Sequence, residues 1–326
     1  MPTDASGEGQ HVAPQIRVER RSVLTAAETA EVVQLVEEVT THDGVRPLSE
    51  HVMLHLRYGG EAPARNFLAY AGDDLAGYAH LDTTDVVEGA SAELAVQPAR
   101  RGAGVGRALV EAVADDAGPG GRLRLWAHGQ QPAAVALARA MGFRRERVLW
   151  QMRRSLFAPV PEPTWPAGVT IRTFEVGADE RSWLEVNNRA FAEHPDQGQW
   201  ALRDLEMREQ EPWFDPAGFF LAERDGQLVG FHWTKVHGAH GPATGSDAHA
   251  GHAHDAIGEV YVVGVDPVMQ GQGLGPALTL RGLQHLRARG LPQVMLYVDE
   301  TNTFAIRTYE RLGFAKWDVD VCFLQQ

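Results

Sequence analysis

Three glycines in the second half of the chain follow an apolar stretch and could bind a phosphate. Val260–Val265 has the apolar residues of a buried strand, and a helix is predicted to begin near Leu274. The loop between them contains Gly271 and Gly273, and Gly275 follows at the helix start. Glycines let the backbone approach a ligand closely, and the free N–H groups of a helix N-terminus attract an anion. The order of strand, loop and helix therefore predicts a pyrophosphate site, although the glycines alone would be weak evidence.

A second loop of the same kind lies in the first half of the chain. A strand is predicted over 91–96, and the spacing Arg101-x-x-Gly104-x-Gly106 follows it. Arg100, Arg101 and Arg107 supply positive charge for a phosphate. The second-half loop carries almost no charge, so its hold on a phosphate would depend on backbone N–H groups and the helix terminus.

The two halves of the chain repeat each other. Gly104 and Gly273 are 169 residues apart, and the Gly-Phe pairs that begin at Gly142 and Gly313 are 171 apart. Landmarks with nearly the same offset indicate the duplication of a whole α/β domain. Four prolines make 157–168 a stiff linker. We therefore predict a disordered tail over 1–15, an N-terminal domain over 16–156, this linker, and a C-terminal domain over 169–326.

Alternation and helical spacing predict the elements that hold the two loops. In the first half we expect strands at 16–19, 66–71, 75–82, 91–96, 122–127 and 147–156, with helices beginning after Thr25, after Ser49 and after the loop, and a fourth over 132–141. In the second half we expect strands at 169–174, 219–223, 228–236, 260–265, 293–298 and 319–324, with helices over 180–191 and 199–209, from Leu274, and over 304–312.

Composition narrows the classes of function. The 326 residues are 44% hydrophobic, enough for two globular cores, and the net charge of −13 argues against a nucleic-acid partner or an anionic membrane surface. Cys322 is the single cysteine, which excludes a disulfide framework within the chain. The chain has no transmembrane stretch and does not open with a signal-peptide pattern. We expect a soluble, cytoplasmic protein and take it to be a monomer, although no sequence feature bears on oligomeric state.

The spacing Gln270-x-x-Gly273-x-Gly275 resembles the acyl-CoA loop of the GCN5-related N-acetyltransferases. Both halves resemble that fold, a mixed α/β sheet whose central strand leads into the loop. The resemblance implies acetyl-CoA as co-substrate and a direct attack of an amine on its thioester, with no catalytic cysteine and no metal. It places the acetyl-CoA contacts on Leu94, Ala95, Val96, Gly102, Ala103, Gly104, Val105, Gly106 and Arg107 in the first half, and on Val263, Gly264, Val265, Gln270, Gly271, Gln272, Gly273, Leu274, Gly275, Pro276, Asn302, Thr303, Phe304, Ala305, Ile306 and Arg307 in the second.

The resemblance also implies the two groups that move protons. The family's tyrosine donor, in the helix before the Gly-Phe pair, corresponds to Tyr309, and its carboxylate base corresponds to Glu259. Equal counts in the first half reach Ala138 and Ala90, neither of which can transfer a proton. We therefore predict a catalytic second half and a first half that holds acetyl-CoA without using it. The alternatives are that Tyr309 only packs against the core and that Glu259 is a solvated strand end.

Longer motifs resemble a tandem-domain branch of this family. Among them are Phe231-His-Trp-Thr-Lys235 and Glu259-Val-Tyr-Val-Val-Gly-Val-Asp-Pro267. That branch acetylates the cysteinyl amine of a cysteine–glucosamine–inositol conjugate, so the resemblance implies this small-molecule amine as substrate. It implies substrate contacts at Asp196, Lys235, Glu259 and Tyr297. A further acidic contact of the branch falls on Thr41 here, so we do not assign that contact.

Two readings compete with this one. The chain could acetylate another amine, such as an aminoglycoside, a polyamine or a protein N-terminus, or it could be an acetyl-CoA-binding sensor. An insert between Lys235 and Glu259 contains His237, His240, His249, His252 and His254. Their spacing could suit a transition metal or a lid over the site, but Gly/Ala/His-rich loops are typically solvated, so we predict no metal site.

Overall fold

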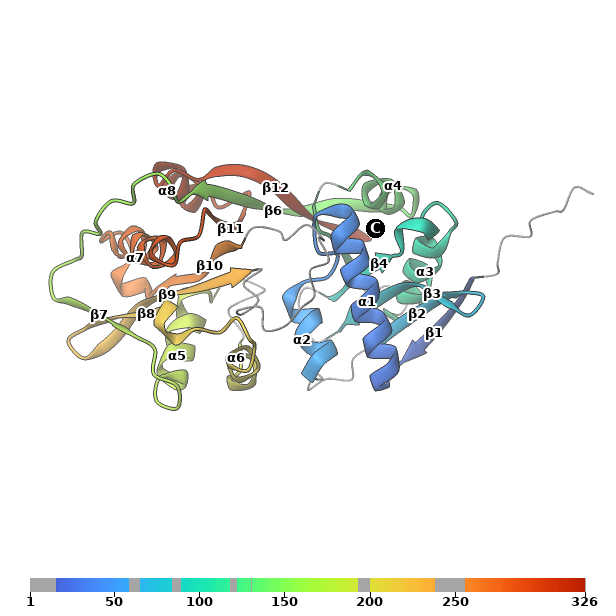
Figure 1. Cartoon of the computed structure of the whole chain (residues 1–326), viewed down its shortest axis with the longest axis horizontal. Coiled ribbons are helices and arrows are strands. Elements are labelled where there is room, and N and C mark those ends of the chain that lie inside the picture. Colours follow the sequence, from blue (N-terminus) through green and yellow to red (C-terminus); the bar gives the residue numbers. More distant parts are fainter. Residues whose placement is uncertain are drawn as a thin grey trace, which may run out of the picture. The chain divides into compact units, whose positions relative to one another are not determined.

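The computed structural model describes residues 16–58, 65–83, 89–117, 122–129, 131–192, 200–237 and 256–325. The chain divides into two compact units, one of Met1–Glu146 with Val321–Gln326 and one of Arg147–Asp320. Each unit is a mixed sheet with helices packed on it (Figure 1), so the predicted α/β class is confirmed.

The described part of the first unit has four helices and five strands of its own. Its helices are α1 (Ala26–Asp43), α2 (Glu50–Tyr58), α3 (Val105–Ala117) and α4 (Pro132–Ala140), and its own strands are β1 (Ile16–Arg21), β2 (Arg65–Ala71), β3 (Asp74–Asp82), β4 (Ala90–Val96) and β5 (Leu123–Ala127). Strands β1 to β4 pair antiparallel in sequence order, and β4 pairs parallel with β5. Apolar side chains of α1 and α2 pack on the face that carries Tyr78 and Ala95. Helix α3 covers the other face, where Gly77 leaves room for Val105 and Leu109.

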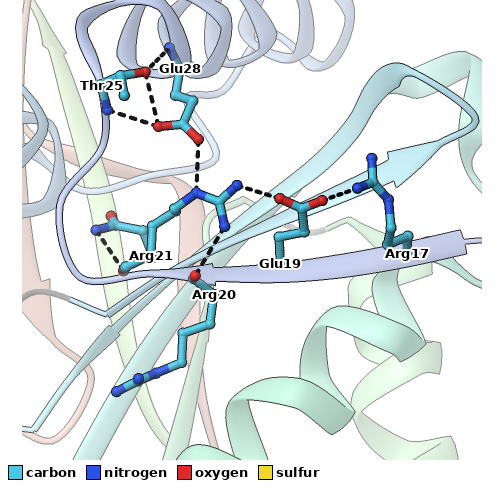
Figure 2. A network of polar contacts seen from close by, with 7 residues as sticks. Arg17, Glu19, Arg20, Arg21, Thr25 and Glu28 are labelled. Carbon is cyan, nitrogen blue, oxygen red and sulfur yellow. Dashed lines mark hydrogen bonds and ion pairs between the residues drawn. The ribbon is translucent and has the colours of Figure 1, made fainter.

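The start of α1 is fixed by a capping box between Thr25 and Glu28, which Figure 2 shows together with the end of β1. The Thr25 hydroxyl oxygen accepts from the Glu28 N–H at 3.2 Å, and the Glu28 carboxylate accepts from the Thr25 N–H at 2.8 Å. Arg21 donates its Nε to the same carboxylate at 2.9 Å and also pairs with Glu19. The cap is thereby tied to the first strand of the sheet.

The second unit repeats this plan. Its helices are α5 (Glu180–Ala190), α6 (Leu202–Glu209), α7 (Leu274–Ala288) and α8 (Thr303–Arg311), and its strands are β7 (Val169–Thr173), β8 (Phe219–Arg224), β9 (Gln227–His237), β10 (Ile257–Val265) and β11 (Gln293–Asp299). Strands β7 to β10 pair antiparallel in sequence order, and β10 pairs parallel with β11. Aromatic side chains of β8 and β9, among them Phe231 and Trp233, form the core with α5 and α6. Helix α7 packs on the opposite face, against Gly230 and His232.

In both units the two parallel strands separate part of the way along. Strand β4 pairs with β5 up to Glu93, while its pairing with β3 continues to Val96. Strand β10 pairs with β11 up to Glu259, while its pairing with β9 continues to Val265, with a bulge at Tyr261. The backbone groups of β4 and β10 beyond these points face an opening between strands, directly before each glycine loop.

The last strand of each half does not join the sheet of its own half. Strand β6 (Phe143–Ser155), expected to complete the first half, pairs antiparallel with β11 from Leu149 to Ser155. Strand β12 (Ala315–Gln325) pairs antiparallel with β5 from Val321 to Leu324. The predicted ranges 16–156 and 169–326 therefore do not coincide with the compact units. The sequence pattern of a strand indicates that it is a strand but does not indicate which strand it pairs with. The division of the chain into domains at 157–168 stays a prediction.

Candidate active site

The first unit contains a cavity at the opening of β4 from β5. Its volume is about 360 Å³, and it is bordered by the glycine loop, by α4 and by the end of β5. Most residues predicted to contact acetyl-CoA in the first half line it, namely Leu94, Ala95, Val96, Gly102, Gly104, Gly106 and Arg107. Ala103 and Val105 belong to the same loop and helix start but do not line the cavity.

The arginines beside this cavity are partly neutralised by carboxylates of the same unit. Arg101 forms a bidentate pair with Asp43, at 2.8 and 2.7 Å. Burial opposes ionisation of Asp43, but the hydrogen bonds from Arg101 outweigh it and lower the pKa of Asp43. Arg100 pairs with Asp74 at 3.1 Å. Arg101 lines the cavity while its pair with Asp43 ties the loop to the end of α1, and a role of the three arginines in binding a phosphate stays a prediction.

The first unit also contains a buried carboxylate that counting along the sequence missed. The first-half residue that corresponds to Glu259 by its distance from the loop is Ala90. The buried carboxylate belongs instead to Glu93, the last residue of β4 that pairs with β5. The Glu93 carboxylate accepts from the Ser49 N–H and lies 3.4 Å from His128 Nε2. Burial works against the charge, but these partners lower the pKa of Glu93. Glu93 is therefore an ionised group bonded at the N-terminus of α2.

The second-unit loop has the backbone that a phosphate site needs. Gly271 and Gly273 both adopt left-handed conformations, with φ of 76° and 84°, and an added Cβ at either would meet nothing within 4 Å. Gly273 is the N-cap of α7, so the free N–H groups of that helix open onto the loop. Arg224 donates to Gln272 Oε1 at 3.4 Å, which brings a positive charge to a loop predicted to be nearly uncharged. Arg224 is the last residue of β8, and no local sequence pattern links it to the loop.

Gly264 is required by close packing. A Cβ there would lie 2.6 Å from two ring atoms of Phe231 and 3.2 Å from Phe191. Packing against an aromatic ring therefore explains this glycine. The separation of β10 from β11 begins earlier, after Glu259.

Three predicted substrate contacts lie on one face of the second sheet. Cross-strand pairing places Lys235 opposite Glu259 and Glu259 opposite Met295, so their side chains point to the same side, and Tyr297 follows two residues later on that side. Lys235 and Glu259 are buried, with 6% and 7% of their surfaces exposed, whereas Tyr297 is 40% exposed. The fourth contact, Asp196, lies outside the described residues.

Polar and aromatic partners hold these side chains. His237 Nε2 lies 2.6 Å from Glu259 Oε2, so Glu259 is bonded rather than being a solvated strand end. The Lys235 ammonium lies 4.1 Å from the centre of the Trp213 ring and 5.0 Å from that of Tyr261. These aromatic partners were not predicted, because cation–ring contacts between distant segments leave no sequence signal. Of the insert's five histidines only His237 is described, and the part of the chain that is described holds no cluster of three or more metal-ligating side chains.

Tyr309 lies on the other side of the sheet. Helix α8 packs it against the core that includes Leu296 and Val298, and its ring meets Phe314 edge to face at 5.8 Å between centroids. Burial raises the pKa of Tyr309 to about 12, so the phenol keeps its proton at neutral pH.

The remaining predicted acetyl-CoA contacts of the second half lie on β10, on the glycine loop and at the start of α8. The Asn302 carboxamide oxygen accepts from the Ala305 N–H at 3.0 Å and so caps α8. Phe304 is 74% exposed, and Thr303 and Arg307 border a surface depression with Glu310.

Comparison with known proteins agrees with this geometry. The model of the acetyltransferase (GNAT) family matches residues 32–143 and 181–314, once in each half. The chain is similar to the mycothiol acetyltransferases of Acidothermus cellulolyticus (60% identical, covering 94% of each chain) and Streptosporangium roseum (57%, covering 94% of this chain and 98% of that one). Its fold is similar to that of a tandem GNAT protein from the clavulanic acid biosynthesis pathway, with a TM-score of 0.71, 21% identity and coverage of 95% and 98%.

These matches confirm both resemblances predicted from the sequence, including the two GNAT regions and an acetyltransferase activity that uses acetyl-CoA. No helix among the described residues is long and apolar enough to cross a membrane. The chain belongs to the GNAT acetyltransferase family and, within it, to the mycothiol acetyltransferases.

Proposed function

We propose that the chain transfers acetyl from acetyl-CoA to the cysteinyl amine of a cysteine–glucosamine–inositol conjugate, the last step of mycothiol biosynthesis. One observation carries the proposal. Lys235, Glu259 and Tyr297 share a face of the sheet where β10 leaves β11, just before the second glycine loop. An acidic group suits an amine, and the lysine and tyrosine suit the oxygens of a sugar conjugate. The names of the relatives support the same substrate.

In the proposed mechanism Glu259 is the base. The substrate ammonium gives a proton to the carboxylate, directly or through a water molecule, and the neutral amine attacks the thioester carbonyl. A carbon–nitrogen bond forms and the carbon–sulfur bond breaks. His237 bonds one carboxylate oxygen and thereby leaves the other to face the substrate. The roles of Asp196, Lys235 and Tyr297 are to hold the conjugate.

Tyr309 is the proposed acid. Its pKa of about 12 keeps it protonated until the thiolate departs. Because the conjugate acid of that thiolate has a pKa near ~8.5, the transfer to sulfur is uphill, and it is completed when the phenolate takes the second proton of the acylated, cationic nitrogen. The backbone of Val263–Val265 and the loop Gln270–Pro276 would hold the acetyl-CoA, with Asn302–Arg307 along α8. Arg224 adds charge at this loop.

We propose that the first unit holds acetyl-CoA without catalysing transfer. Its cavity has the lining and the glycine loop for that ligand. Ala138 occupies the position that corresponds to Tyr309, and Glu93 is engaged by Ser49 and His128. We further propose that the protein needs no metal and acts as a cytoplasmic monomer, with no nucleic-acid or membrane partner.

The test is an acetylation assay with purified protein and acetyl-CoA. The conjugate is compared with an aminoglycoside, a polyamine and a peptide with a free N-terminus. Because the conjugate carries its own thiol, the product is followed by mass rather than by a thiol reagent. Preferred turnover of the conjugate is expected. Turnover of another amine but not of the conjugate would refute the assignment.

A further inference from the structure

The hydroxyl of Tyr297 has a hydrogen-bond donor beside it on the neighbouring strand. Gln151 of β6 lies directly opposite Tyr297 of β11, and its Nε2 donates to the tyrosine oxygen at 2.8 Å. Gln151 is buried, with 8% of its surface exposed. This contact exists because β6, which precedes the Pro-rich stretch, pairs with β11 in the second unit.

The orientation of the Gln151 amide follows from its second neighbour. Arg153 Nε donates to Gln151 Oε1 at 2.8 Å, and the Arg153 guanidinium lies 4.5 Å from the centre of the Trp317 ring. Arginine has donors and no acceptor, so the amide oxygen must face it. The amide NH₂ therefore faces Tyr297, and this assignment does not depend on a choice between the two ends of the amide.

The direction of the tyrosine proton follows in turn. A phenol has one proton to donate, and its oxygen can accept. Because Gln151 uses the oxygen as an acceptor, the proton of Tyr297 must point to another group. Although 40% of Tyr297 is exposed, the atoms packed around its phenol partly desolvate it, and this, together with the negative charges of Asp320 and Glu259, raises the pKa of Tyr297, so the proton is retained. Tyr297 is thus a fixed donor on the face that carries Glu259 and Lys235.

We propose that Gln151 is a positioning residue which, held by Arg153, turns the Tyr297 hydroxyl toward an acceptor oxygen of the amine substrate. The inference rests on the proposed function, in which Tyr297 contacts the substrate. The inference adds a criterion for substrates: a hydroxyl or carbonyl oxygen must lie at a fixed distance from the amine that is acetylated. A simple polyamine lacks that oxygen, so the Tyr297 hydroxyl would donate to water instead and the polyamine would lose this contact.

The test is Gln151→Glu in the full chain. The new carboxylate can still accept from Arg153, which balances its charge, but toward Tyr297 it can only accept. The Tyr297 hydroxyl would then donate to the new carboxylate and could no longer donate to the substrate. We expect the KM for the conjugate to rise about tenfold, with the KM for acetyl-CoA unchanged. Tyr297→Phe should raise it by a similar factor, and the double variant by no more than either single one.

Controls separate this role from a structural one. Gln210→Glu makes the same charge change at an exposed position after α6 and should leave every constant unchanged. Thermal unfolding of Gln151→Glu should match that of the unaltered protein, because the Arg153 bond remains. An unchanged KM for the conjugate in Gln151→Glu, or losses that multiply in the double variant, would overturn the proposal.

A second readout does not need turnover. The side-chain amide signal of Gln151, identified in NMR spectra by its disappearance in Gln151→Glu, should shift in Tyr297→Phe. No shift would overturn the proposal even if the enzyme is active. A protein inactive on the conjugate but showing this shift would refute the proposed function and leave the positioning contact standing, and the kinetic comparison would then use whichever amine is turned over.

Discussion

Replacing Tyr309 by phenylalanine tests the proposed proton donor with little change in packing. The ring contacts to the α8 core and the edge-to-face contact with Phe314 remain, since only a hydroxyl is removed. We expect the free energy of unfolding at neutral pH to change by less than about 1 kcal/mol. Loss of a general acid should lower kcat by roughly 10²–10⁴-fold and leave the KM for acetyl-CoA unchanged.

The buried hydroxyl also predicts how stability depends on pH. The pKa of Tyr309 is raised from its ordinary value of 10.0 to about 12, and two units correspond to about 2.7 kcal/mol. Below pH about 10 both folded and unfolded chains keep the proton, so nothing is lost. As pH rises from about 10 to about 12 the unfolded chain ionises first, and the folded state loses stability. At pH about 11 about half of these 2.7 kcal/mol, or ~1.4 kcal/mol of the free energy of unfolding, should be lost through this one group.

Urea unfolding of both proteins at pH about 9 and about 11 measures this contribution. The unaltered protein should lose more stability than Tyr309→Phe over that interval, because the variant lacks the group. Equal losses would show that the hydroxyl is not buried in solution. If kcat falls by less than about threefold in the variant, Tyr309 is not the acid and the reasoning from its position on α8 fails.

Three further substitutions test other parts of the site. Glu259→Gln keeps the shape of the base but not its charge, and should lower kcat by roughly 10²–10⁴-fold; activity near that of the unaltered protein would remove Glu259 from the mechanism. Gly264→Ala places a methyl group 2.6 Å from the Phe231 ring and should cost about 1–3 kcal/mol in urea unfolding, and full stability would mean that the ring moves freely. Arg224→Gln removes the charge beside Gln272 and should raise the KM for acetyl-CoA severalfold at low salt, with the difference shrinking as salt is added. A salt-independent KM would place Arg224 outside the phosphate site.

Much of the fold followed from local patterns. The helix predicted after Thr25 begins at Ala26 and the helix predicted near Leu274 begins at that residue, because cap chemistry depends on residues next to one another. Strand ranges were within a few residues of those observed. Strand partners were not predictable in this way: β6 and β12 have ordinary strand patterns, and their neighbours are set by packing across more than 100 residues of sequence.

The candidate site divides in the same way. Glu259 and the loop glycines were found because the family's spacing places them at fixed distances along the chain. Gln151, Trp213 and Arg224 reach the site from other strands and loops, and their sequence neighbourhoods carry no mark of it. Equal offsets did not find Glu93, because β4 stays paired with β5 up to Glu93, three residues before its end at Val96, whereas β10 leaves β11 at Glu259, six residues before its end at Val265.

The pairing of β5 with residues 321–324 has a consequence during synthesis. A ribosome adds roughly 5–20 residues per second, so the segment that covers the edge of β5 emerges about 10–40 seconds after β5 itself. During that interval the strand Leu123–Ala127 presents unpaired backbone groups, the kind of edge on which chains aggregate. A chaperone bound to this edge would protect the nascent first unit. The part of the chain that needs this protection is the first unit, which we propose is not catalytic.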